Sequence, residues 1–186
     1  MRTAHPAEVR LPVVQEPRMR RCGHYMADFT REEARALSHL VLDRNAIQIA
    51  DAINYSPERR TAQPVTPTMV RDWLNSLRVK TGVRTRAQLV DVACRAKLLL
   101  PPRAVLTQPL RASAVKTFQL AALGHTSHRI AAIQGISRFT VGSHLKDIRY
   151  RMRTRGTPAA VYRLHGVPGV LDSTPICLVC AKGGPR

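Results

Sequence analysis

The segment 137–153, SRFTVGSHLKDIRYRMR, decides the fold of this 186-residue chain. Its apolar residues recur every three or four positions, which places them along one side of an α-helix. These residues are Val141, Leu145, Ile148 and Met152. Ser137 is a good N-cap, because its hydroxyl can accept a hydrogen bond from a free N–H of the first turn. We therefore predict a helix over residues 137–153 with an apolar side that packs into a core.

The remaining surface of this helix is small and basic. Winding the sequence at about 100° per residue gathers the basic residues and a glycine on one arc beside the apolar stripe. The arc holds Arg138, Gly142, Lys146, Arg149 and Arg153, with Phe139 and Ser143 beside it. Such a surface suits insertion into the major groove of DNA. The alternative is a solvated basic face without a ligand.

The composition also favours a polyanionic partner. The chain has 30 Lys and Arg against 12 Asp and Glu, a formal net charge of +18, which points to nucleic acid before a membrane surface. Residues 29–100 carry a net charge of +5 and residues 101–172 carry +9. The second part should therefore supply more of any salt-dependent attraction. Ribosomal and nucleoid proteins share this kind of charge.

Several function classes lack their sequence signals. No apolar run approaches the roughly 18–20 residues of a membrane-spanning helix, and the start of the chain lacks the apolar middle of a signal peptide. We expect a cytoplasmic, nucleoid-associated protein without a membrane partner. There is no phosphate loop, carboxylate cluster or nucleophile–base pair. We accordingly expect neither an enzyme nor a cofactor.

Helix signals begin at Phe29. Thr30 with Glu33, and Asn45 with Gln48, have capping-box spacing and predict two helix starts. The first of these helices should run to about Leu42. Thr66-Pro67 predicts a third start, and Gly82 its end. A fourth helix should cover roughly 86–99, before Pro101-Pro102. We expect Cys94 on this helix, and Trp73 on the third helix, to fill core space.

The pattern then repeats. A shift of 81 residues aligns Leu37 with Phe118 and Ile49 with Ile130, and a shift of 71 aligns Val70 with Val141 and Arg78 with Arg149. The difference is a ten-residue insertion at 56–65. We predict an all-α chain with two tandem four-helix units, 29–100 and 101–166. A flexible arm, 1–28, precedes them, and a loose tail, 167–186, follows.

The second unit resembles a known family. Its segment 130–148, IAAIQGISRFTVGSHLKDI, resembles the helix-turn-helix of LuxR-type regulators, with the pattern IA-x-x-L-x-IS-x-x-TV-x-x-HL-x-x-I. The first unit fits more loosely, although TGVRTRAQLV at 81–90 is close to the end of the family's module. The resemblance covers about three quarters of the chain. It implies four-helix modules with the third helix in the major groove and the fourth available for dimerisation, so a second copy of the chain is a candidate partner.

The resemblance also assigns DNA contacts. Bases would be read by Gly142, Ser143 and Lys146, and by Arg71, Asp72 and Asn75 in the first unit. A lysine or arginine can donate to guanine, and an asparagine can pair with adenine. The phosphate anchors would be Arg138, Arg149, Arg151 and Arg153, with Arg78 as the counterpart of Arg149. Thr126 and Thr140 would offer hydroxyls and helix-start N–H groups, and His144 is either structural or a phosphate neighbour.

Some residues depart from the family's pattern. Gly142 stands where a long polar side chain is usual, and Gln134 replaces a core leucine. Trp73 stands where the family has a histidine. Asp72 would repel phosphate unless it accepts from cytosine. Together with the insertion, these departures leave two interpretations of the first unit. It reads DNA, or it keeps the same fold and serves as a docking or pairing module.

The cysteines allow a metal site. Cys177 and Cys180 form a C-x-x-C pair, and Cys22 lies close to His24. These four residues would make a tetrahedral zinc site if the two ends of the chain met. The alternative is free thiols in a loose tail, and a cytoplasmic location argues against a structural disulfide.

These observations predict a sequence-specific transcription regulator that reads double-stranded DNA with the helix 137–153 and the helix 66–80. The alternative of another class is an adaptor that binds a sigma factor or an RNA polymerase subunit, with DNA contact secondary. The charge alone also permits a non-specific nucleoid or RNA-binding protein.

Overall fold

The computed structural model describes residues 29–57, 63–104, 106 and 108–171, and its regular elements over these ranges are all α-helices, as predicted. They are α1 (Arg31–Leu40), α2 (Ala46–Asn54), α3 (Pro67–Thr81), α4 (Arg86–Arg95), α5 (Ala112–Ala122), α6 (Ser127–Gln134), α7 (Arg138–Arg151) and α8 (Thr157–His165). None of these helices has the length and apolar composition needed to cross a bilayer. The arm 1–28 and most of the tail lie outside the described residues.

The helix starts follow the capping residues in the sequence. Both predicted capping boxes form, Thr30 with Glu33 on α1 and Asn45 with Gln48 on α2. The Thr66 side chain accepts from the backbone N–H of Met69 at the start of α3, and Gly82 ends that helix at a left-handed φ of 70°. Local side-chain chemistry therefore fixes where these helices begin and end.

The fourth helix is shorter than predicted. It ends at Arg95 instead of continuing to residue 99, because Lys97 adopts a φ of 61° and the N–H of Leu98 bonds back to the carbonyl of Ala93 at 2.9 Å. This is the pattern of a helix-ending turn. Leu98 and Leu99 are nevertheless buried. Their burial extends the apolar pattern beyond the end of the helix.

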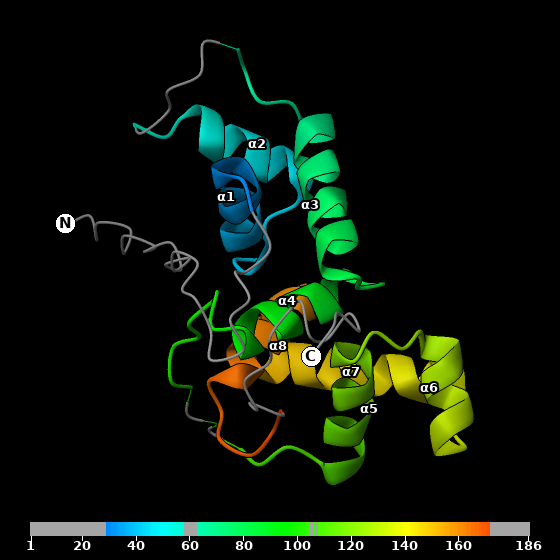
Figure 1. Cartoon of the computed structure of the whole chain (residues 1–186). Helices are drawn as coiled ribbons and strands as arrows, with labels where there is room; N and C mark the ends of the chain where they lie inside the picture. Colours follow the sequence, from blue (N-terminus) through cyan, green and yellow to red (C-terminus); the bar gives the residue numbers. More distant parts are fainter. Residues whose placement is uncertain (1–28, 58–62, 105, 107, 172–186) are drawn as a thin grey trace, which may run out of the picture.

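The helices form two groups with a shared middle. In Figure 1, α1–α3 lie in the upper part and α5–α7 in the lower part, with α4 and α8 between them. The α4–α8 pair makes the most extensive helix contact in the described part of the chain. The main core includes residues of α1–α5, α7 and α8, and a smaller core of Ala121, Ile130, Ala131 and Val141 lies under α7.

Polar contacts reinforce the α4–α8 junction. His165 Nε2 lies 2.9 Å from Asp91 Oδ1, and both side chains are nearly inaccessible to solvent. The hydroxyl of Tyr162 donates to the carbonyl of Leu100 at 2.8 Å. Gly166 is required where the linker crosses the end of α8, because a Cβ there would lie 1.9 Å from the Pro102 carbonyl oxygen. The junction therefore has one defined geometry.

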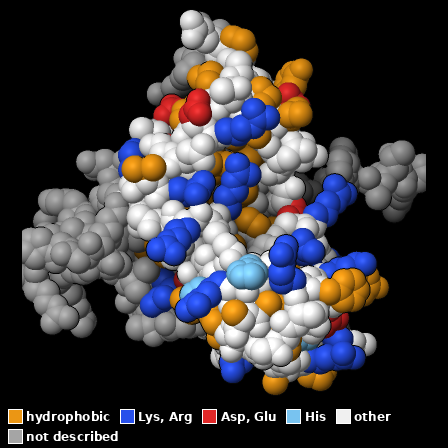
Figure 2. Space-filling model, turned by 90° about the vertical axis from the view of Figure 1, so that its right-hand side faces the viewer, with side chains coloured by type: hydrophobic (Ala, Val, Ile, Leu, Met, Phe, Trp, Pro, Cys, Tyr) orange, Lys and Arg blue, Asp and Glu red, His pale blue; other side chains and the backbone are white. Residues whose placement is uncertain are grey.

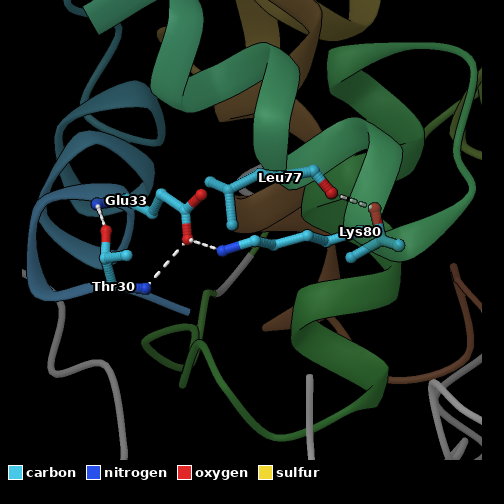
Figure 3. A network of polar contacts seen from close by, with 5 residues as sticks. Thr30, Glu33, Leu77 and Lys80 are labelled. Atoms are coloured by element: carbon cyan, nitrogen blue, oxygen red, sulfur yellow. Dashed lines mark hydrogen bonds and ion pairs between the residues drawn. The ribbon is translucent and has the colours of Figure 1, made fainter. Parts of the chain in front are cut away.

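A buried carboxylate joins α1 to α3. Glu33 accepts from Lys80 Nζ at 2.7 Å and from the backbone N–H of Thr30 at 2.8 Å (Figure 3). Burial alone would raise the pKa of Glu33, but its hydrogen bonds with Lys80, Ser76 and Thr30 and the charge of Lys80 bring the pKa below its usual value. The paired carboxylate thus remains ionised inside the upper helix group.

Asp43 connects the two helix groups. It lies between α1 and α2 at a φ of 64°, and its carboxylate accepts from the backbone N–H groups of Arg155 at 2.5 Å and Gly156 at 2.7 Å. Gly156 is the N-cap of α8 and has no side chain with which to cap it. Asp43 therefore caps α8 from a position 113 residues earlier in the chain.

We expect Asp43→Asn to lower the free energy of unfolding by about 1–2 kcal/mol, because the amide can accept only one of the two bonds and presents a donor to the other N–H. Chemical denaturation of the full chain measures this change. Asp51→Asn is the control, since it makes the same charge change at an exposed site on α2. Equal losses in both variants would contradict a capping role.

His39 should make stability depend on pH. Its burial, and then the charges of Arg44 and Arg35, lower its pKa from 6.5 to about 4. The unfolded chain therefore takes up this proton first, so the stability is complete above pH 6.5 and decreases as the pH falls toward 4. We expect a loss of about 2–3 kcal/mol from this group. Urea unfolding across that range should be less pH-dependent in His39→Gln; identical profiles would contradict it.

Candidate nucleic-acid interface

Helix α7 is held by its predicted apolar side. Val141 and Ile148 are fully buried, Leu145 is half-buried, and Met152, which follows the last turn, is buried. At the other end the Ser137 hydroxyl accepts from the backbone N–H of Thr140 at 3.0 Å. The cap and the core contacts together determine which side of α7 faces solvent.

The solvent side of α7 carries the residues expected there. Arg138, Gly142, Ser143 and Lys146 are exposed, and a Cβ on Gly142 would meet nothing within 4 Å. Phe139 is also 85% exposed, as its place beside the basic arc predicted, although the resemblance assigned it no DNA contact. The small residues leave the middle of the helix accessible to a large ligand.

The surrounding surface is rich in cations. Figure 2 shows Lys and Arg side chains spread across the side of the molecule that carries α3 and α6, with few acidic side chains among them. Asp147 is the only acid in α7, and it pairs with Arg151 at 3.0 Å. Asp147 is thus engaged by Arg151, and neither of the exposed residues Arg138 and Lys146 is paired with it.

Three of the predicted phosphate anchors, Arg149, Arg151 and Arg153, differ from Arg138 in their contacts or position. Arg149 donates to the backbone carbonyls of Leu145 at 3.2 Å and Arg155 at 3.4 Å. Arg151 is paired with Asp147, and also donates to Gln108 at 3.1 Å. Arg153 is exposed, but it follows the end of α7 at a φ of 50°. The described chain already occupies the first two guanidinium groups.

His144 faces the inside of its helix group. Its Nδ1 lies 2.9 Å from the hydroxyl oxygen of Thr117, a fully buried residue of α5. The same hydroxyl lies 2.8 Å from Gln134 Oε1, so α5, α6 and α7 meet in one polar cluster. Gln134, which replaces a leucine of the family pattern, thus has a partner. Sequence reasoning did not single out Thr117.

The corresponding positions of α3 are exposed but less basic. Arg71, Asp72 and Asn75 face solvent, and Asn75 Oδ1 accepts from Arg78 at 3.3 Å. Trp73 is half-buried against the core, as expected. Arg71 and Asp72 leave this surface with little net charge, in contrast to α7.

The turns that follow α3 and α7 have the same contacts. Arg78 donates to the carbonyl of Arg84 at 2.6 Å, and Arg149 donates to that of Arg155, six residues on in both cases. Gly82 and Arg153, also 71 positions apart, both adopt a left-handed φ. The Nε of Arg78 is buried without a partner in the described part of the chain. The two segments therefore share local backbone geometry, as well as sequence pattern.

A groove of about 670 Å³ lies between the helix groups. The N-caps of four helices line it: Asn45, Thr85, Thr126 and Gly156. The Thr126 side chain accepts from the backbone N–H of Arg129 at 3.3 Å and is exposed, so its hydroxyl hydrogen can still be donated. Arg44, Arg86 and Arg155 add positive charge to the groove. A nucleic-acid backbone that passed between the two helix groups would contact these N-caps and arginines first.

The described residues contain no cluster of three or more His, Cys, Asp or Glu that would hold a metal ion. The zinc ligands that the sequence suggested, Cys22, His24, Cys177 and Cys180, lie outside the described residues. Cys94 is buried in α4, and burial raises the pKa of its thiol above the usual range. It is therefore a core residue, as predicted.

Comparison with known proteins adds no assignment. The chain matches no protein-family model, no curated protein and no solved structure at a significant level. The interpretation of α7 therefore depends on its own residues.

Gly142 offers a test of close approach. We expect Gly142→Ala to raise the free energy of unfolding by about 0.5–1 kcal/mol, because glycine is a poor residue inside a helix and the added Cβ meets no neighbour. If DNA approaches the α7 backbone here, the same variant should bind DNA more weakly despite its greater stability. Thermal unfolding and electrophoretic mobility shifts measure the two effects. A stabilised variant with unchanged DNA affinity would show that Gly142 has no contact.

Proposed function

We propose that this chain is a sequence-specific double-stranded DNA-binding transcription regulator that acts in the cytoplasm, on the nucleoid. The exposed side of α7 would enter the major groove. The observation that carries this proposal is the arrangement on α7: Gly142 and Ser143 are exposed between Arg138 and Lys146, opposite a side that is buried in the core. A short, small-faced, cationic helix fits the width and the negative potential of the groove.

Each exposed residue has a suitable contact in this arrangement. Lys146 would donate to the O6 and N7 acceptors of guanine, and Ser143 would contact a neighbouring base. The apolar ring of Phe139 would lie against a thymine methyl group. Arg138, Thr140 and Thr126 would hold phosphates and set the register without reading sequence.

We further propose that the chain contains two LuxR-type units, 29–100 and 101–166. The shared contacts of Arg78 and Arg149 support this interpretation. In the family, the fourth helix is available for dimerisation, and here the corresponding helices α4 and α8 pack against each other. One chain would then supply both halves of a dimer-like reader, and its preferred site would be asymmetric because α3 and α7 differ.

Selection of bound fragments from a random duplex library tests the proposal. We expect recovery of one asymmetric sequence, bound with an affinity that decreases steeply with salt. Recovery of unrelated sequences with equal affinity would reject specific recognition and leave a non-specific nucleic-acid-binding protein.

Lys146→Ala should weaken binding to the selected site by about 1–3 kcal/mol and relax the preference at one base pair. Lys116→Ala removes the same charge from an exposed position of α5 and is the control. Affinities for the selected site and its single-base variants measure the effect. An equal, sequence-independent loss in both variants would mean that Lys146 contributes only general charge.

A second candidate function applies to α3. Its exposed surface combines Asp72 with the apolar Met69, 38% exposed, and Val79, 78% exposed. Such a surface suits a protein partner better than phosphates. We propose it as a docking site for a sigma factor or an RNA polymerase subunit. A pull-down with purified polymerase that persists after nuclease treatment and is lost in Val79→Asp would support this role.

A further inference from the structure

A pocket lined by four arginines lies between the two helix groups. It has a volume of about 340 Å³ and is lined by the α1–α2 loop, the α7–α8 loop and α8. Its charged residues are Asp43, Arg44, Arg153, Arg155 and Arg163. Sites for small molecules begin at about this volume. The exposed Arg138, Ser143 and Lys146 of α7 do not line it, although the pocket shares Asp43, Arg44 and Arg155 with the larger groove between the helix groups.

The arginines lack matching counter-ions among the described residues. In the described lining Asp43 is the only carboxylate, and its two oxygens already accept from the backbone N–H groups of Arg155 and Gly156. Arg44 lies 2.8 Å from the Nδ1 of His39, which burial keeps neutral, and Arg163 donates to the carbonyl of Met152 at 2.8 Å. The described lining therefore has a net charge of +3, which a bound anion would offset.

The fold itself does not require this cluster. The sequence repeat gives each arginine an equivalent position in the other repeat. Only one of these four positions also holds an arginine. His125 corresponds to Arg44, Gly82 to Arg153 and Val92 to Arg163, whereas Arg84 corresponds to Arg155. The same local backbone is thus built without the other three arginines. Their presence on one side only indicates a role beyond folding.

The backbone gives the same indication. Asp43 and Arg153 have left-handed φ values of 64° and 50°, a conformation that aspartate tolerates and that costs energy for a long side chain such as arginine. Both equivalent positions hold glycine, Gly124 at 88° and Gly82 at 70°. Arg153 ends α7 in the same kind of turn that Lys97 makes after α4, so its φ belongs to the helix end. An arginine where the equivalent position holds glycine again adds a charge that the backbone does not need.

We propose that this pocket binds a small molecule that carries several phosphate groups, such as a nucleoside triphosphate. Planar guanidinium groups bind phosphate oxygens in pairs, and several of them in one pocket favour a polyphosphate over a monoanion. Because the lining comes from both helix groups, the ligand would contact the α1–α2 loop and the α7–α8 loop at once. It would thereby fix the orientation of the two groups.

Titration of the full-length protein with inorganic tripolyphosphate, followed by calorimetry, tests the proposal without DNA. We expect saturable binding of one tripolyphosphate per chain. Arg155→Ala should weaken it at least tenfold, whereas Arg84→Ala, which removes the same charge at the equivalent position, should change it less than twofold. Arg153→Gly should also weaken it at least tenfold while it keeps the folded state, because glycine relieves the positive φ.

The alternative source of phosphate is the DNA backbone, and duplex DNA is the second arm. Support requires that Arg153→Gly loses tripolyphosphate but binds a short duplex within twofold of the unmodified chain. Arg155 also lines the groove with the four N-caps, so Arg155→Ala is compared on tripolyphosphate alone. Three results would overturn the proposal: no saturable binding, equal losses in Arg84→Ala and Arg155→Ala, or unchanged tripolyphosphate binding with weakened duplex binding. Because the first arm contains no DNA, failure of the proposed DNA-binding function would be seen separately.

Discussion

The packing of α4 against α8 is the constraint on which the rest of the structure depends. Ala93, Cys94, Val161 and Leu164 are buried in the core to which both helices contribute, and the Asp91–His165 contact is nearly inaccessible to solvent. Burial of this apolar surface is the main favourable contribution, while the polar pair defines one alignment of the helices. Since α3 and α7 each connect to one of these helices, this packing also determines where their exposed sides lie.

The turn that follows each long helix shows how one local solution serves two purposes. Arg78 and Arg149 bond to the carbonyl six residues later, and a left-handed residue lies between them and that carbonyl. After α3 the left-handed residue is Gly82, which has no strain. After α7 it is Arg153, whose side chain lines a pocket with Arg155. The two turns have the same backbone conformation, so folding does not require the positive charge that Arg153 adds after α7.

Much of the fold could be predicted because its determinants are local. Capping boxes, Pro67 at a first turn and Gly82 at a helix end act within a few residues, so the sequence pattern alone located them. The predicted end of α4 was wrong because Leu98 and Leu99 remain buried beyond the helix. An apolar pattern does not distinguish a helix from a tight turn. The Asp43 cap on α8 could not be predicted, since it joins residues 113 positions apart.

The candidate interface was predictable to the same extent. The exposed positions of α7 follow from helical periodicity, and the structure places Arg138, Ser143 and Lys146 in solvent. Periodicity does not show where a long side chain ends, however. Arg149 lies on the basic arc of the helix but bends toward two backbone carbonyls, and Arg151, which lies outside that arc, pairs with Asp147. The arginine pocket was not anticipated, because its residues come from two distant loops and α8 and meet only in the folded chain.

The distribution of the few acids connects folding with function. Four of the described acids have partners within the chain. Glu33 binds Lys80, and Asp43 binds two backbone N–H groups. Asp91 binds His165, and Asp147 binds Arg151. Three of these carboxylates join separate elements of the fold, whereas Asp147 pairs with Arg151 within α7. Asp51 and Asp72 are exposed on α2 and α3. The cations that they do not reach, such as Arg138 and Lys146 on α7, keep their positive potential in the solvent. Glu33 and Asp91 are buried in internal contacts, whereas Arg138 and Lys146 on α7 stay exposed and remain available to a polyanion.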